Sequence, residues 1–210
     1  MTGPADAPGG PGTPPPAFDH QPYFCEENAW RLCAHPLLAG SEVLVAMVTG
    51  ARAGWRVRCR RQRAAGPAGV LEWDYHVLVF ARPAAVVTAT DATAAAASGS
   101  LPAAWQAWDL DSTLPLPCTA AEWLSGTFRP PAPVWLLPFF RVFSGAEYRR
   151  VLSSDRAHMR TGERWHKPPP PWPAIGESPA NLFDLLDPQR PVPGEVLDLA
   201  ALRARLAGRA

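Results

Sequence analysis

The chain has 210 residues, of which 47% are hydrophobic and 19% are charged, and its formal net charge is +1. This length and composition are typical of one globular domain with a sizeable core. The nearly neutral charge gives no indication of a nucleic-acid partner or an anionic membrane. No stretch reaches the roughly 20 apolar residues of a membrane span, and the first residues lack the apolar core of a signal peptide.

The four cysteines are widely spaced and form no CxxC pair: Cys25, Cys33, Cys59 and Cys118. Without an export signal, this spacing indicates reduced thiols in a cytoplasmic protein, with a nuclear location also open if the source is eukaryotic. The five histidines and the cysteines show no zinc-type spacing. We therefore expect neither a bound metal nor another cofactor.

Composition divides the chain into a tail, a domain and an insertion. Residues 1–21 are rich in Pro, Gly and Ala, which predicts a disordered tail. Residues 22–210 read as a single domain. Residues 88–104 are rich in Ala, Thr and Ser and indicate a surface insertion that is flexible or weakly helical.

Hydrophobic spacing predicts a helix from Cys25 to about residue 35, with Glu26 and Glu27 in its first turn, where the helix dipole favours acids. Residues 41–48 are a core helix or strand. Alternating apolar and basic residues over 54–63 favour the solvated face of a strand over an RNA-binding patch. Further strands are predicted at 70–81, 105–110 and 139–143, and further helices at 119–126, 146–152 and from Asp198. The order predicts an α+β fold with a mostly antiparallel sheet flanked by helices.

Three residue types in this pattern could form a nucleophilic site. Cys25 opens a helix, where the dipole favours a thiolate, although such a cysteine is often only a small core residue. His76 lies within an apolar strand, with Asp74 on the same strand face, and could equally be a buried neutral histidine. Asp109 and Asp111 share a face of a later strand or cap its end. These are the parts of a Cys–His–Asp site, and the residues alone leave open whether they meet.

Several segments, in collinear order over roughly 22–208, resemble the protein N-terminal glutamine amidohydrolases of the N-degron pathway. The matching segments are YFCEENAWRLC at 23–33, WDYHV at 73–77, DLDSTLPLPC at 109–118, SDRAHM at 154–159, RWHKPPPPWP at 164–173 and GEVLDLAALRARL at 194–206. The stretch between WDYHV and DLD is longer than in the family. If the excess only extends a hairpin, the site survives, whereas a one-residue register shift would turn Asp109 to the other face.

The resemblance implies a papain- or transglutaminase-like core, in which a helix carrying the cysteine packs on a sheet carrying the histidine and the acid. It places the nucleophile at Cys25, the histidine at His76 and the acid at Asp109, in preference to Asp74. The implied activity is hydrolytic deamidation of an N-terminal glutamine to glutamate, through a thioester, on proteins or peptides. We expect a monomer.

The acids beside Cys25 need an explanation, because a charge about 6 Å from the thiolate disfavours it by about 3 kcal/mol at an effective dielectric of 20. We predict that Glu26 or Glu27, with Asp155 as another candidate, binds the α-ammonium of the substrate. Solvated acids at a helix start remain the alternative. The competing functions are a papain-like peptidase or transglutaminase with the same triad, a non-catalytic reader of N-terminal residues, and an adaptor that uses the proline-rich segments.

Overall fold

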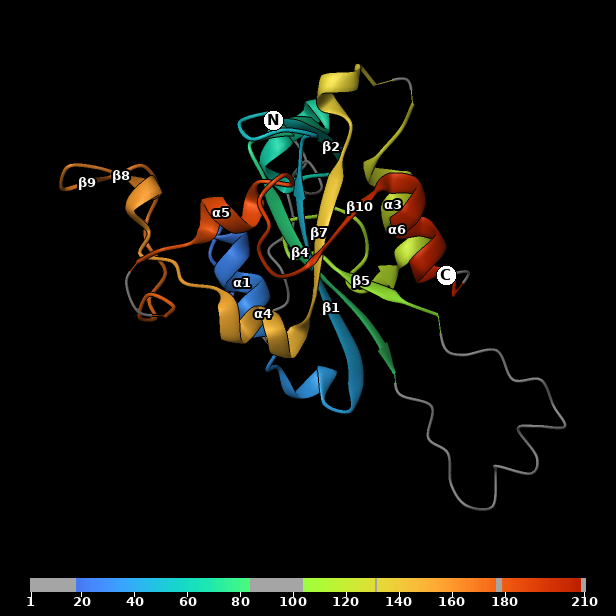
Figure 1. Cartoon of the computed structure of the whole chain (residues 1–210), viewed down its shortest axis with the longest axis horizontal. Coiled ribbons are helices and arrows are strands. Elements are labelled where there is room, and N and C mark those ends of the chain that lie inside the picture. Colours follow the sequence, from blue (N-terminus) through green and yellow to red (C-terminus); the bar gives the residue numbers. More distant parts are fainter. Residues whose placement is uncertain (1–17, 84–103, 131, 177–178, 209–210) are drawn as a thin grey trace, which may run out of the picture.

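The computed structural model describes residues 18–83, 104–130, 132–176 and 179–208 (Figure 1). A six-stranded sheet in the order β10-β7-β1-β4-β5-β6 forms the centre, and each neighbouring pair is antiparallel. Its strands are β1 (Ser41–Thr49), β4 (His76–Pro83), β5 (Gln106–Trp108), β6 (Cys118–Thr119), β7 (Phe139–Ser144) and β10 (Glu195–Asp198). Two small sheets pair β2 (Val57–Arg60) with β3 (Val70–Trp73) and β8 (Arg160–Thr161) with β9 (Arg164–Trp165).

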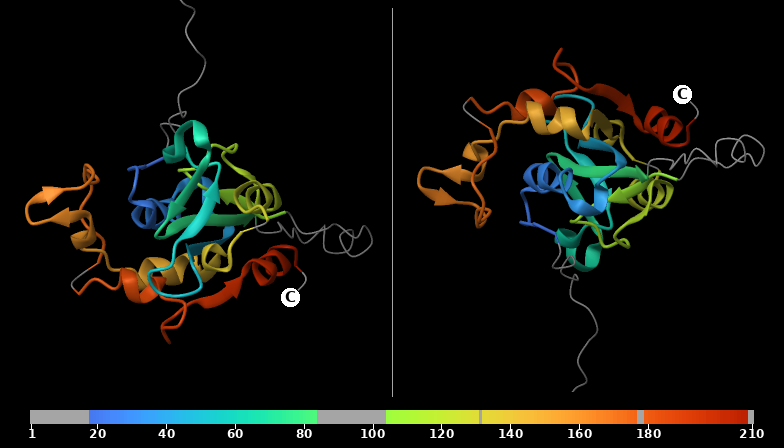
Figure 2. Two further views of the ribbon diagram at one scale, coloured as in Figure 1. Left: turned by 90° about the horizontal axis from the view of Figure 1, so that it is seen from above. Right: turned by 90° about the horizontal axis from the view of Figure 1, so that it is seen from below.

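Helices cover both faces of the central sheet (Figures 1 and 2). On one face lie α1 (Cys25–Leu32), α4 (Gly145–Val151) and α5 (Leu182–Leu186), and on the other lie α3 (Ala120–Thr127) and α6 (Leu199–Leu206). Side chains of β1 alternate between the two cores, since Val45 and Met47 face α1 while Ala46 and Val48 face α3. The predicted α+β class, with a mostly antiparallel sheet flanked by helices, is confirmed.

Side-chain caps define where three of these helices begin. The Thr119 hydroxyl accepts from the Glu122 amide while the Glu122 carboxylate accepts from the Thr119 amide, which makes a capping box before α3. The side chains of Ser144 and Asp198 cap α4 and α6 by accepting from the amides of Glu147 and Ala201, without the reciprocal hydrogen bond. These short helices therefore start within one residue of the predicted positions.

The stretch 70–81, predicted as one strand, is two strands in different sheets. The chain leaves β3 at Trp73, and β4 begins at His76. Asp74 is exposed and pairs with Arg56 at 3.0 Å, so it does not lie on the strand face of His76. Similarly, β5 ends at Trp108, so Asp109 and Asp111 follow the strand rather than share one of its faces. The apolar residues of 70–81 and 105–110 predicted strands there, but they did not predict that the chain bends after Trp73 and after Trp108.

Several short elements were not predicted, namely α5, β6, β8, β9 and β10. A single buried cation holds the segment between α5 and β10. The Arg141 guanidinium, on β7, donates hydrogen bonds to the carbonyls of Leu185, Asp187, Arg190, Val192, Pro193 and Gly194. Gly194 has φ of 93°, and a Cβ there would lie 2.8 Å from Arg141 and Phe143. Non-local hydrogen bonds therefore order a segment with little local pattern of its own.

The end of the predicted tail is packed on the domain. Phe18 lies against Trp108 with ring centroids 5.9 Å apart, His20 Nε2 is 2.9 Å from Asp111 Oδ1, and Gln21 exchanges hydrogen bonds with Asn28. Residues 1–17, and the predicted insertion apart from Ala104, lie outside the described residues. Within the described ranges, no helix is long and apolar enough to span a bilayer.

Candidate active site

Cys25 is the first residue of α1 and follows a tight turn. Tyr23 adopts a left-handed backbone conformation with φ of 71°, and the Phe24 amide donates to the Gln21 carbonyl at 3.2 Å. Residues with positive φ cluster at functional sites, because the surrounding structure must hold them. Cys25 is 8% exposed, and its backbone N–H has no hydrogen-bond partner among the described residues. The turn thus leaves both the thiol and one amide donor available at the helix start.

His76 begins β4, against which α1 packs. The next residue, Val77, packs in the same core as Cys25, and its backbone N–H partly offsets the rise in the pKa of the thiol. His76 Nε2 lies 3.0 Å from Asp109 Oδ1, and both side chains are 2% exposed. Trp73 stacks on the imidazole at 6.1 Å between centroids. With Nε2 engaged by the carboxylate, Nδ1 is the nitrogen left for proton exchange.

Asp109 is held at both carboxylate oxygens. Oδ2 accepts from the Trp123 indole at 2.8 Å and from Gln62 Nε2 at 3.4 Å, while Oδ1 also accepts from the Asp111 amide at 3.1 Å. The antiparallel pairing of β4 with β5, Val79 opposite Trp108, brings the residue after β5 to the start of β4. The extra residues between the strands therefore leave the histidine and the acid in contact.

The pKa shifts of His76 and Asp109 make the His76 imidazole a stronger base. Burial lowers the pKa of His76, but the charge and hydrogen bond of Asp109 outweigh it and raise that pKa above its usual value. Burial raises the pKa of Asp109, yet His76, Trp123 and the Asp111 amide bring it below the usual value. Burial, then the charges of Glu26 and Asp111, raise the pKa of the Cys25 thiol well above normal. Cys25 is thus a neutral thiol at rest and His76 a strengthened base, contrary to the expected depressed pKa of the thiol.

Glu26 is fully buried next to the nucleophile. Its Oε2 lies 3.8 Å from Cys25 Sγ and accepts a 3.1 Å hydrogen bond from the Tyr75 hydroxyl. Its Oε1 has no hydrogen-bond partner among the described residues, and His158 Nε2 is 3.9 Å away. Burial is the main reason that the pKa of Glu26 rises to about 7. A buried carboxylate oxygen without a donor is costly and suits a missing cation.

Glu27 occupies a different environment from its neighbour. Arg156 donates to both of its carboxylate oxygens at 2.7 Å, and the Trp172 indole donates to Oε2 at 2.7 Å. Arg156 adopts the left-handed conformation, with φ of 60°, and is itself buried. This ion pair ties α1 to the proline-rich segment, so the charge of Glu27 is already compensated.

Asp155 is exposed and accepts from the Ala157 amide at 2.8 Å. It lines a cavity of about 230 Å³ together with His158 and Phe183, and Phe183 also lines a cavity of about 430 Å³ that reaches Tyr75. The His158 ring contacts Phe183 and hydrogen-bonds Tyr75 at 3.2 Å. The space on the buried side of Cys25 measures only about 10 Å³, about one water, so the cavities near His158 offer the room for a peptide.

A metal-binding arrangement also occurs at this site. Ligand atoms of His76, Asp109 and Asp111 lie within 4.8 Å of one another. The imidazole and Asp109 already hydrogen-bond each other, and Asp111 pairs with His20. These hydrogen bonds already occupy the three side chains, so the arrangement suits an acid–base role for His76 and Asp109 better than metal binding.

Sequence reasoning missed most of the residues that support the three candidates, although it gave His158, in SDRAHM, as a residue that could line the cleft. Gln62, Trp73 and Trp123 contact Asp109 or His76 from three separate elements, and Tyr75 and His158 meet over Glu26. Of these, Trp73, Tyr75 and His158 fall inside the family-like segments quoted above. Trp123 and Gln62 carry no local signal, because only the packing of α3 and β2 brings them to Asp109.

Comparison with known proteins gives an independent result. Residues 20–206 match the family described as N-terminal glutamine amidase. The chain is 35%, 32% and 29% identical to proteins named protein N-terminal glutamine amidohydrolase from Drosophila willistoni, Arabidopsis thaliana and Homo sapiens, respectively. The aligned regions cover 72%, 80% and 88% of this chain and 69%, 73% and 85% of those relatives.

Proposed function

Because the chain belongs to the N-terminal glutamine amidase family, we propose that it hydrolyses the side-chain amide of N-terminal glutamine on proteins and peptides, yielding glutamate and ammonia. Cys25, His76 and Asp109 are the catalytic residues of this proposal. The observation that carries it is the contact of His76 with Asp109, together with the packing of Cys25 in the same core as Val77, the residue after His76. A cysteine helix packed on a sheet that carries the histidine and the acid also supports a papain- or transglutaminase-like core.

The reaction starts with attack of Cys25 Sγ on the carboxamide carbon, while the thiol proton moves to His76 Nδ1. The Cys25 amide, which has no other partner in the described part of the chain, donates to the developing oxyanion. The imidazolium then protonates the departing nitrogen, and ammonia leaves a glutamyl thioester. His76 next takes a proton from water, which attacks the thioester and releases the carboxylate. Asp109 holds the imidazole orientation and stabilises its cationic form.

Restriction to a free N-terminus is assigned to Glu26. An α-ammonium that displaces His158 from Glu26 Oε1 would satisfy this buried oxygen and favour the ionised carboxylate. The bound α-ammonium would also offset the repulsion between the ionised Glu26 carboxylate and the Cys25 thiolate. Glu27 has a structural role in this proposal, because Arg156 and Trp172 use both of its oxygens. Asp155, on the outer side of His158, guides the cation inward.

The test measures ammonia release from Gln-, Asn- and acetyl-Gln-peptides by the wild type and by Cys25→Ala. We expect turnover of the Gln-peptide only, and none by the variant. Peptide cleavage or cross-linking in place of ammonia release would identify a peptidase or transglutaminase, and binding without turnover a reader of N-terminal residues. Equal rates on Gln- and acetyl-Gln-peptides would refute the role of Glu26 while leaving the triad intact. We further propose that the enzyme acts as a cytoplasmic monomer.

A further inference from the structure

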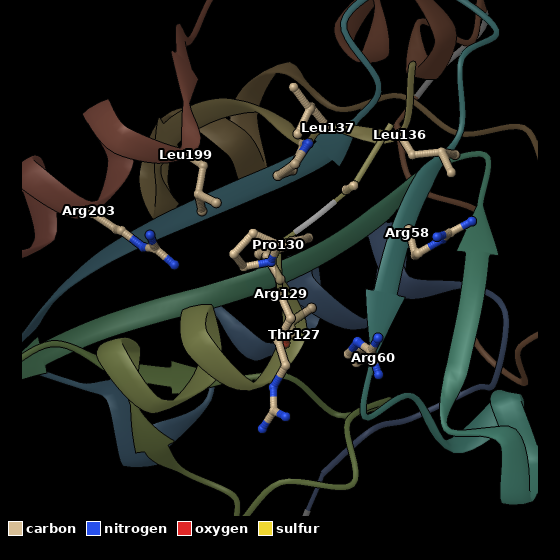
Figure 3. Close-up of a pocket in the computed structure, with 12 residues that line it drawn as sticks. Arg58, Arg60, Thr127, Arg129, Pro130, Leu136, Leu137, Leu199 and Arg203 are labelled. Atoms are coloured by element: carbon tan, nitrogen blue, oxygen red, sulfur yellow. The ribbon is translucent and has the colours of Figure 1, made fainter. Parts of the chain in front are cut away.

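A cavity of about 230 Å³ lies far from Cys25, across the central sheet (Figure 3). Its walls come from β2, the end of α3, the turn η3 (Val134–Leu136) with the residues around it, and the start of α6. These elements pack on the sheet face opposite to α1. The cavity therefore shares no residue with the candidate active site, and the reaction proposed above does not use it.

The cavity combines an apolar floor with a cationic edge. Its apolar surface comes from Phe128, Leu136, Leu137, Leu199 and nearby prolines. None of the twelve lining residues is acidic. Four of them are arginines: Arg58, Arg60, Arg129 and Arg203. In a chain with a net charge of only +1, four guanidinium groups around one apolar cavity are a marked local excess.

Three of these arginines lack a counter-ion. Arg58 donates two hydrogen bonds to Glu72 Oε1, at 2.8 and 3.2 Å. Within the ranges that the structure describes, Arg60, Arg129 and Arg203 form no ion pair. Arg203 extends from α6 towards the middle of the cavity, whereas Arg58 turns to the neighbouring strand (Figure 3). Like charges gathered without an anion repel one another, and a bound anion would remove that cost.

The surroundings of the cavity suit a ligand with an apolar part. Leu137 is 39% exposed at its edge, and Trp135 next to it is 57% exposed. Thr127, in the wall, is fully buried, and its hydroxyl has no partner in the described part of the chain. An unpaired buried hydroxyl is unfavourable, and a polar ligand atom could reach this one only after the cavity wall moves, because the hydroxyl has no accessible surface in this structure. Exposed apolar side chains beside a pocket are typical of a binding site.

We propose that this cavity binds a small anionic amphiphile, a molecule with a carboxylate or phosphate head and a short apolar body. Arg203, which extends towards the middle of the cavity, holds the head, because its planar donors match both anions, and Arg60 on the opposite side adds to the positive charge around it. Phe128 and the leucines hold the body. The cavity is smaller than typical cofactor sites, which limits the ligand to a short chain or one ring. This site is independent of the proposed deamidation.

Calorimetric titration with octanoate and octyl phosphate at low ionic strength tests this proposal, with octan-1-ol and octylammonium as probes that lack the anion. We expect one equivalent of at least one anion to bind, at least tenfold more tightly than octanol or octylammonium. The anion with the higher affinity identifies the head group. Binding should weaken as salt is added, because exposed charges are screened.

Two double variants assign the binding to the cavity. Arg60→Gln with Arg203→Gln should weaken anion binding at least tenfold. Arg150→Gln with Arg164→Gln removes the same charge from exposed positions outside the cavity and should leave the affinity unchanged. The proposal is overturned if neither anion binds, if octanol binds equally well, or if both double variants lose the same affinity. Unfolding temperatures of both variants identify any loss that comes from misfolding.

Discussion

The Trp123 indole donates to Asp109 Oδ2 at 2.8 Å, on the carboxylate oxygen that does not contact His76. The hydrogen bond comes from α3, on the far side of the sheet from the nucleophile helix. It fixes the plane of the carboxylate and helps to lower the pKa of Asp109. The carboxylate that contacts the His76 imidazole is therefore itself oriented from the opposite core.

Removing this donor should impair turnover more than binding. Hydrogen bonds to charged groups contribute about 1.5–3 kcal/mol, so we expect Trp123→Phe to lower kcat about 10- to 100-fold with little change in KM. Because the lost hydrogen bond lowers the pKa of Asp109, the acidic limb of the kcat profile should move to higher pH. Trp105→Phe, at another buried tryptophan, is the matched control. An unchanged pH profile with a lower unfolding temperature would show that Trp123 acts only through packing.

Replacing Glu26 should stabilise the protein and weaken its binding of the substrate. Its pKa rises from 4.5 to about 7 on folding, so its ionisation destabilises the fold above about pH 7 and has no effect below about pH 4.5. Glu26→Gln imitates the protonated acid. Its free energy of unfolding, relative to wild type, should rise by about 3 kcal/mol between these limits.

The activity of Glu26→Gln supplies the second half of this test. KM for Gln-peptides should increase at pH 7.5, where the wild-type carboxylate is ionised and the α-amino group, with a pKa of about 8, still carries its charge. Glu163→Gln, at an exposed position, controls for the loss of one negative charge. A stability difference that is constant with pH would contradict the raised pKa, and an unchanged KM would remove Glu26 from substrate binding.

Breaking the Glu27–Arg156 pair should destabilise the fold without changing specificity. Glu27→Gln leaves a buried guanidinium without its counter-ion, which typically costs about 3–5 kcal/mol. The double change Glu27→Leu with Arg156→Met should cost less than the sum of the single changes in urea unfolding. Measured where each variant is folded, KM should stay within a few-fold of wild type. A large rise in KM in a fully folded variant would return Glu27 to the ammonium site.

Residues 18–21, which pack on the domain, should contribute to its stability. A chain that begins at residue 22 loses the contact of Phe18 with Trp108 and that of His20 with Asp111, next to the catalytic acid. We expect it to be about 0.5–3 kcal/mol less stable than a chain that begins at residue 18, and slower in ammonia release. Equal unfolding temperatures and rates for the two chains would show that these contacts contribute nothing.

The sequence by itself was enough to predict the α+β class, most helix starts and the three catalytic candidates. Apolar spacing and local caps are short-range signals, so α3, α4 and α6 begin where Thr119, Ser144 and Asp198 predict. The assignment of Cys25, His76 and Asp109 came from resemblance, because the residues alone left Asp74 and Asp111 open. The bend after Trp73, which turns Asp74 outward, has no local pattern that distinguishes it from a continuous strand.

Only the tertiary structure decided the environments of the acids beside the nucleophile. Glu26 and Glu27 are adjacent and chemically identical in sequence, yet one keeps an unpaired oxygen while the other is paired by Arg156 and Trp172. Their partners Arg156 and His158 lie more than 120 residues away along the chain, and only packing brings them near. The same holds for Trp123 at Asp109 and for the arginines at the distant cavity, since charge and burial are properties of neighbours in space.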